Sequence, residues 1–82
     1  MSIIIENSSV TIRGYRFITQ IAPSKRQVVF IDPQRGNREV LRAEMPDDAL
    51  RYASARDTFQ KKLGRMILDY YERQHKEAAF GV

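Results

Sequence analysis

The sequence predicts an α+β domain in which a small antiparallel β-sheet of three or four strands packs against a long C-terminal amphipathic helix. Apolar residues recur at a spacing of two before residue 45, and a turn rich in proline and glycine interrupts them. After residue 46 they recur at spacings of three and four. The 82 residues predict one domain, with the sheet in 1–45, the helical part in 46–79 and a tail in 80–82.

The first strands are predicted from alternation. Val10 and Ile12 share one phase, and after Gly14 the alternation resumes one residue out of step, with Tyr15, Phe17 and Ile21. A slip at glycine indicates a bulge or a tight bend. A further short edge strand over Ile3–Ile5, joined through Asn7–Ser9, is also expected.

A second hairpin follows the turn at 22–25. Gln27–Ile31 is β-branched and aromatic, which favours a strand. In 32–37, Asp32 can accept hydrogen bonds from the turn backbone, and Gly36 can take the left-handed conformation. The strand over 38–45 then alternates again.

Pro46 and the two aspartates after it favour a helix start. Ser54, followed by an acid three residues later, leaves two arrangements open: one helix over 47–79, or a short helix to about Ala53 and then a long one. We favour a break near Ser54, because an unbroken helix would overhang so small a sheet. For Gly64 both a close approach of another backbone and a tolerated surface position remain open. The predicted core stripe is Tyr52, Ala55, Phe59, Leu63, Met66, Ile67 and Tyr70.

Charge is distributed unevenly along the chain. Between Val10 and Arg42 there are seven basic and two acidic residues, whereas from Glu44 to Glu77 seven of each sign balance. Glu6 completes the net charge of +4. A positive field concentrated in one half of a small domain indicates an anionic partner.

Alternation predicts that the basic side chains share the sheet face turned away from the helix. The inner face would carry Tyr15, Phe17, Ile21, Val28, Phe30, Leu41, Ala43 and Met45. The candidate contacts for nucleic acid or an acidic partner on the outer face are Arg13, Arg16, Arg38 and Arg42. The same face carries Gln20 and a predicted apolar interface, which consists of Ile18, Val29, Ile31 and Val40.

Three uses of this face compete. Arginines on neighbouring strands can neutralise phosphates, which makes nucleic acid the first expectation for an external partner. No aromatic residue falls on the face, although sheet-surface RNA binders depend on stacking. We also expect the chain to form a homodimer through the sheet face or its edge, which is compatible with either external partner, and an acidic protein is the alternative to nucleic acid.

Residue types argue against catalysis. The chain has no cysteine, its single histidine is His75, and its four glycines are scattered. We therefore expect no enzyme activity, no metal and no small-molecule cofactor. No signal peptide or membrane span is recognisable, so a cytoplasmic location is expected.

Overall fold

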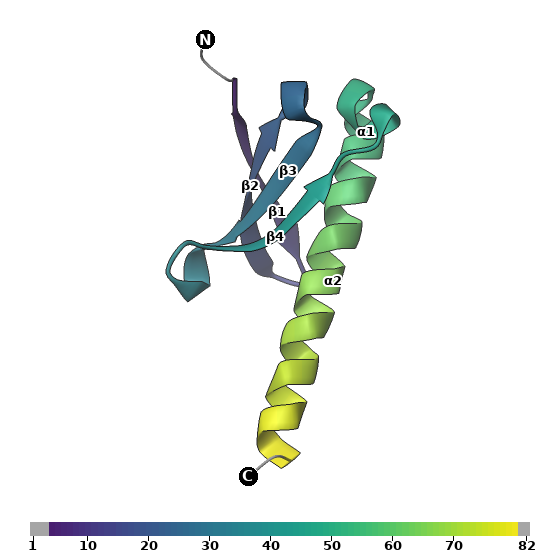
Figure 1. Cartoon of the computed structure of the whole chain (residues 1–82). Coiled ribbons are helices and arrows are strands. Elements are labelled where there is room, and N and C mark those ends of the chain that lie inside the picture. The colour runs from purple at the N-terminus through teal and green to yellow at the C-terminus, as the bar shows by residue number, and fades with distance from the viewer. Residues whose placement is uncertain (1–3, 81–82) are drawn as a thin grey trace.

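The computed structural model describes the backbone of residues 4–80 and the side chains of residues 4–75. It confirms the α+β prediction (Figure 1). Four antiparallel strands lie in chain order in one sheet, and the long helix extends past the sheet. The elements are β1 (Glu6–Ile12), β2 (Tyr15–Ala22), β3 (Gln27–Asp32), β4 (Arg38–Glu44), α1 (Asp47–Arg51) and α2 (Ala53–Phe80).

A tight bend joins β1 to β2. Arg13 and Gly14 both have positive φ, 53° and 78°, and Ile12 lies directly opposite Tyr15. Left-handed residues at both loop positions are typical of the two-residue turn that suits the twist of a hairpin. The phase slip at Gly14 is therefore a turn.

The prediction of an edge strand over Ile3–Ile5 is wrong for Ile4 and Ile5. Ile3 lies outside the described residues, while Ile4 and Ile5 are exposed and precede the strand. The segment Asn7–Ser9, expected as a connection, belongs to β1 and pairs with β2. Three polar residues in a row concealed this strand from an analysis of apolar alternation.

The turn between β3 and β4 follows the expected chemistry. The carboxylate of Asp32 accepts a hydrogen bond of 2.9 Å from the backbone N–H of Gln34. Gly36 has a φ of 73°, in the left-handed region. The β4 strand that follows contains an irregularity, because Phe30 pairs with Leu41 but Ile31 pairs with Glu39.

The helical half is broken, as favoured above. Tyr52 has extended backbone angles (φ −121°, ψ 128°) and separates α1 from α2. The guanidinium group of Arg56 donates to the backbone oxygens of Ala49 and Leu50, at 3.0 and 3.1 Å, and pairs with Glu6 at 3.2 Å. Arg56 therefore caps α1 and ties it to β1.

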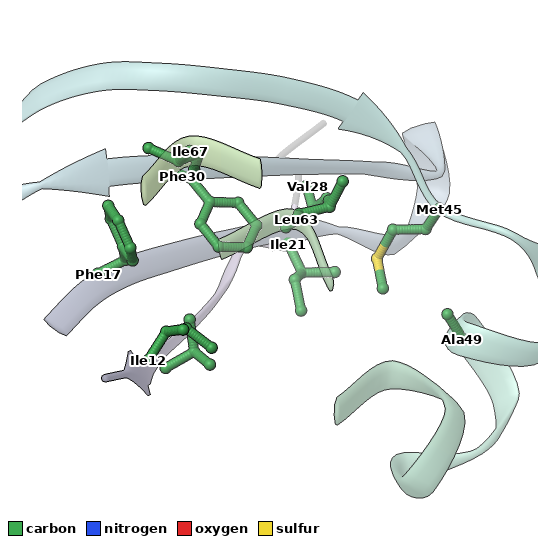
Figure 2. Packing of buried hydrophobic residues seen from close by; sticks show 10 residues of the cluster. Ile12, Phe17, Ile21, Val28, Phe30, Met45, Ala49, Leu63 and Ile67 are labelled. Atoms are coloured by element: carbon green, nitrogen blue, oxygen red, sulfur yellow. The ribbon is translucent and has the colours of Figure 1, made fainter. Parts of the chain in front are cut away.

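The helix α2 lies close against β1. A Cβ added at Gly64 would lie 2.7 Å from Cγ1 of Ile12, so this glycine permits a close approach. Figure 2 shows Leu63 and Ile67 of α2 meeting Phe30 and its neighbours. The buried core consists of Val10, Ile12, Phe17, Ile21, Val28, Phe30, Met45, Ala49, Leu63 and Ile67.

The predicted stripe of α2 is rotated in the structure. Tyr52, Met66 and Tyr70 are exposed, whereas Gln60 is buried and Tyr71 packs against the core. The amide of Gln60 donates to the hydroxyl of Thr19 at 3.4 Å. Because this buried amide has a partner, hydropathy alone could not place the buried side of the helix.

Candidate functional site: a groove between β4 and α2

Part of the predicted surface forms on the outer sheet face. Ile18 lies opposite Ile31, and Val29 lies opposite Arg42, so the central strands present a half-buried apolar patch there. Arg16 lies on the same face at the edge of β2, opposite Thr11.

The other predicted contacts do not share that face. Arg13 occupies the β1–β2 turn, and its guanidinium group reaches Asp69 of α2 at 3.4 Å. Arg38 lies opposite Asp32, whose side chain is buried on the helix side. Val40 is the extra residue of the β4 irregularity and packs against the core. The placement of Arg13, Arg38 and Val40 on the outer face was therefore wrong.

For Arg38 and Val40 the cause is a β-bulge that carries no mark in the sequence, whereas Arg13 lies in the β1–β2 turn itself. A bulge inserts one residue into a strand and reverses the phase of alternation beyond it. Strict alternation predicts the correct sheet face for Arg42 and the wrong face for Arg38, because the inserted residue lies between them. The four arginines are consequently divided between the turn, the outer face and the helix side.

The outer face keeps little free positive charge. Arg42 and Glu39 form an ion pair of 2.6 Å on the surface. Their hydrogen bond and mutual attraction raise the pKa of Arg42 and lower that of Glu39. Arg16 is the one predicted arginine on this face without an ion pair among the described residues.

A hollow lies on the other side of the sheet, between β4 and the C-terminal part of α2. It has a volume of about 730 Å³. Its apolar lining includes Val40, Leu41 and Ile67, and it also includes Met66 and Tyr70, which are 51% and 52% exposed. Since α2 lies toward β1, the β4 side of the inner face stays partly uncovered.

Cations line the same groove. Arg38 comes from β4 and Arg73 from α2, and neither forms an ion pair within the part of the chain that the structure describes. The acidic side chains of the lining are already engaged, Glu39 with Arg42 and Asp69 with Arg13. The groove therefore combines an apolar wall with two uncompensated guanidinium groups.

A buried carboxylate anchors one end of the groove. Asp32 is 0% exposed and accepts hydrogen bonds from the hydroxyls of Tyr15, at 2.6 Å, and Tyr71, at 2.8 Å. The guanidinium of Arg35 lies 3.8 Å from this carboxylate and 3.6 Å from the centre of the Tyr71 ring. These contacts hold the β3–β4 turn against α2.

This cluster also changes the titration of its tyrosines. Burial, followed by the hydrogen bond to Asp32, raises the pKa of both Tyr15 and Tyr71 above the ordinary value of 10.0. Both hydroxyls therefore stay protonated as donors at neutral pH. The arrangement is that of a structural anchor, since the carboxylate has no exposed surface for a substrate.

The groove cannot be recognised from local sequence patterns. The basic residues at 38 and 73 are visible in the sequence, but no local pattern brings the two elements together. Tyr70 was assigned to the core stripe, whereas the structure exposes Tyr70 and packs Tyr71 against the core. A polar partner for a helical tyrosine, such as Asp32, becomes apparent only from the tertiary structure.

Within the described residues, no group of three or more histidine, cysteine, aspartate or glutamate side chains is placed to hold a metal ion. No helix in that part of the chain has the length and apolarity needed to cross a membrane. Comparisons of the chain with protein-family models, curated proteins and solved structures found no match.

Proposed function

We propose that the chain is a small, non-enzymatic basic binding module that holds an acidic segment of a partner protein in the groove between β4 and α2. The observation that carries this proposal is that the guanidinium groups of Arg38 and Arg73, which have no ion-pair partner among the described side chains, lie beside the exposed side chains of Met66 and Tyr70. An acidic segment with a few apolar residues complements both features.

Charge and burial favour this partner over nucleic acid. Nucleic acid is bound chiefly through phosphates, by cations that follow its backbone. The four arginines expected to do so lie on different sides of the molecule, and Arg42 and Arg13 are already paired. Exposed methionine and tyrosine beside arginine are instead the residue types enriched at protein interfaces.

The electrostatic part of the binding should be modest in strength. Hydrogen bonds from a guanidinium to a carboxylate contribute roughly 1.5–3 kcal/mol each when partly desolvated. Exposed pairs contribute less, about 0–1 kcal/mol. Affinity would therefore depend on the apolar contacts with Met66 and Tyr70, and the arginines would govern orientation and the rate of encounter.

The test compares two double variants of equal charge. The probes are a fluorescent peptide that alternates glutamate with leucine, a lysine–leucine peptide of the same length, and single- and double-stranded DNA of mixed sequence. In Arg38→Ala/Arg73→Ala the groove loses both cations. In Arg16→Ala/Arg51→Ala the chain loses two exposed cations outside the groove.

We expect the glutamate–leucine peptide to bind the unmodified protein, and the lysine–leucine peptide to fail. Arg38→Ala/Arg73→Ala should weaken binding by about tenfold, which corresponds to about 1.4 kcal/mol. The Arg16→Ala/Arg51→Ala control should lose no more than about twofold. Equal losses in both double variants would mean that only net charge matters. Tighter binding of DNA, with steep salt dependence, would restore the nucleic-acid hypothesis.

A further inference from the structure

The two edges of the sheet are built differently. At β4 the strand contains the bulge at Val40, and its exposed residues are charged: Arg38, Glu39, Arg42 and Glu44. Bulges and charges are the usual protection of an open sheet edge against pairing with another strand. This edge is therefore unsuited to pairing.

The β1 edge lacks both kinds of protection. Its register with β2 runs without interruption from Glu6 to Ile12. Between these ends the exposed residues, Asn7, Ser8, Ser9 and Thr11, are small, polar and uncharged. Glu6 carries the only charge of the strand, and it is paired with Arg56 of the same chain.

The tight turn determines which backbone groups of β1 point outward. In a two-residue hairpin the residues flanking the loop, here Ile12 and Tyr15, exchange backbone hydrogen bonds, and the pattern alternates from there. The amides of Asn7, Ser9 and Thr11 are then directed away from β2. Among the described residues, no backbone hydrogen bond outside the helices and strand ladders involves 6–12.

We propose that β1 pairs with β1 of a second copy of this chain, antiparallel and centred on Ser9, to form a continuous eight-stranded sheet. Ser9 would face Ser9 of the second copy, and Asn7 would face Thr11. These are the outward-directed amides, so each pair can exchange two hydrogen bonds. No like charges face each other along this edge.

Two surroundings of the edge fit a second copy. Ile4 and Ile5, 75% and 51% exposed, precede β1, and in the same register they would lie against the β1–β2 turn of the second copy. The flank of α2 turned away from the groove carries Leu68 and the ion pair of Asp57 with Lys61, at 3.0 Å. The charges of Asp57 and Lys61, which the neighbouring helix of the second copy would meet, thus compensate each other.

Cross-linking offers a direct test, because the chain contains no cysteine. In Ser9→Cys, two cysteines would face each other across the symmetry axis, with Cα atoms about 5.5 Å apart, which a disulfide can bridge. Ser24→Cys, at an exposed serine in the turn between β2 and β3, is the matched control. We expect Ser9→Cys to form an intermolecular disulfide at least about tenfold faster than Ser24→Cys under mild oxidation.

Sedimentation velocity on cysteine-free protein completes the test. The unmodified protein should dimerise with rising concentration. Ser9→Lys, which places two ammonium groups face to face, should shift it to monomer. Gln20→Lys adds the same charge to the outer face of β2, away from the edge, and should still dimerise. A monomeric unmodified protein, equal cross-linking of the two cysteine variants, or dissociation by Gln20→Lys alone would overturn the proposal. None of these outcomes depends on binding in the groove.

Discussion

The hydroxyl of Tyr71, on α2, donates a hydrogen bond of 2.8 Å to the buried carboxylate of Asp32, the last residue of β3. Tyr15 of β2 donates a second bond to the same oxygen, at 2.6 Å. One carboxylate therefore joins two strands to the helix, at the end of the groove where Arg35 also lies. The position of α2, and so the shape of the groove, depends on this contact.

Replacing Tyr71 with phenylalanine should weaken this junction. The change removes one of the hydrogen bonds to a carboxylate that has no access to water. Hydrogen bonds to charged groups contribute about 1.5–3 kcal/mol, so Tyr71→Phe should lower the free energy of unfolding by about that much. Urea unfolding followed by circular dichroism measures this change in the free energy of unfolding.

Tyr70→Phe is the matched control for that change. The Tyr70 hydroxyl is exposed and accepts a hydrogen bond from the side chain of Gln74, at 2.8 Å. Surface changes of this kind usually alter stability by no more than about 0.5 kcal/mol. Equal effects of the two variants would show that the Tyr71–Asp32 bond contributes nothing to stability.

Alkaline pH should destabilise the fold through the same tyrosines. In the folded state the pKa values of Tyr15 and Tyr71 lie above the ordinary 10.0, because burial and Asp32 disfavour the phenolate. Below about pH 10 the hydroxyls are protonated in both states, so their contribution is complete. Above it the unfolded chain releases protons that the folded chain retains, and stability falls as pH rises.

The measurement is a series of urea unfolding curves between about pH 8 and pH 11. The free energy of unfolding should fall at the alkaline end of the series for the unmodified protein. Tyr71→Phe should show a shallower fall, because one of the two shifted hydroxyls is gone. If the two proteins had parallel pH profiles, the titration of Tyr71 would be uncoupled from folding.

Local patterns predicted the elements because their causes are local. Asp32 and Gly36 specify a turn by their own hydrogen bonding and backbone freedom, and the residues around Tyr52 end a helix near where Ser54 indicated. Gly14 marked a change of direction for the same reason. Such features need no knowledge of what packs against them.

The candidate site had non-local causes, which explains why it was mostly missed. The bulge at Val40 changes the facing of Arg38 without any glycine or proline to mark it. The rotation of α2 follows from Gly64 meeting Ile12 and from Tyr71 meeting Asp32, residues that are far apart in the chain. Neither contact produces a periodic pattern in the sequence.

The close approach at Gly64 predicts an unusual response to alanine. Alanine favours a helix over glycine by about 1 kcal/mol. Here its Cβ would lie 2.7 Å from Cγ1 of Ile12, and overpacking costs about 1–3 kcal/mol. Gly64→Ala should therefore lower the free energy of unfolding by up to about 2 kcal/mol.

Ile12→Ala provides the background that isolates this contact. It is itself destabilising, but it removes the atom that an alanine at 64 would meet. In that background Gly64→Ala should become stabilising, by up to about 1 kcal/mol. A double-mutant cycle, measured by urea unfolding, gives the coupling free energy between the changes at residues 12 and 64. If Gly64→Ala had the same effect in both backgrounds, α2 would not approach β1 at this point.

Gly36 separates backbone strain from packing. Its φ is 73°, and an added Cβ would meet nothing within 4 Å, so any cost of substitution comes from the left-handed conformation itself. Valine resists that conformation, and Gly36→Val should cost about 1–3 kcal/mol. Asparagine tolerates it, so Gly36→Asn should cost clearly less.

Thermal unfolding resolves the two variants, because about 1 kcal/mol shifts the melting temperature of a domain this size by roughly 4–8 °C. We expect Gly36→Val to melt lower than Gly36→Asn by at least that interval. Backbone strain should dominate this difference, since a Cβ at residue 36 meets nothing within 4 Å. Equal melting temperatures would mean that residue 36 does not hold a positive φ. The turn that sets the register of β4, the bulge at Val40 and the facing of Arg38 toward the groove would then all have to be revised.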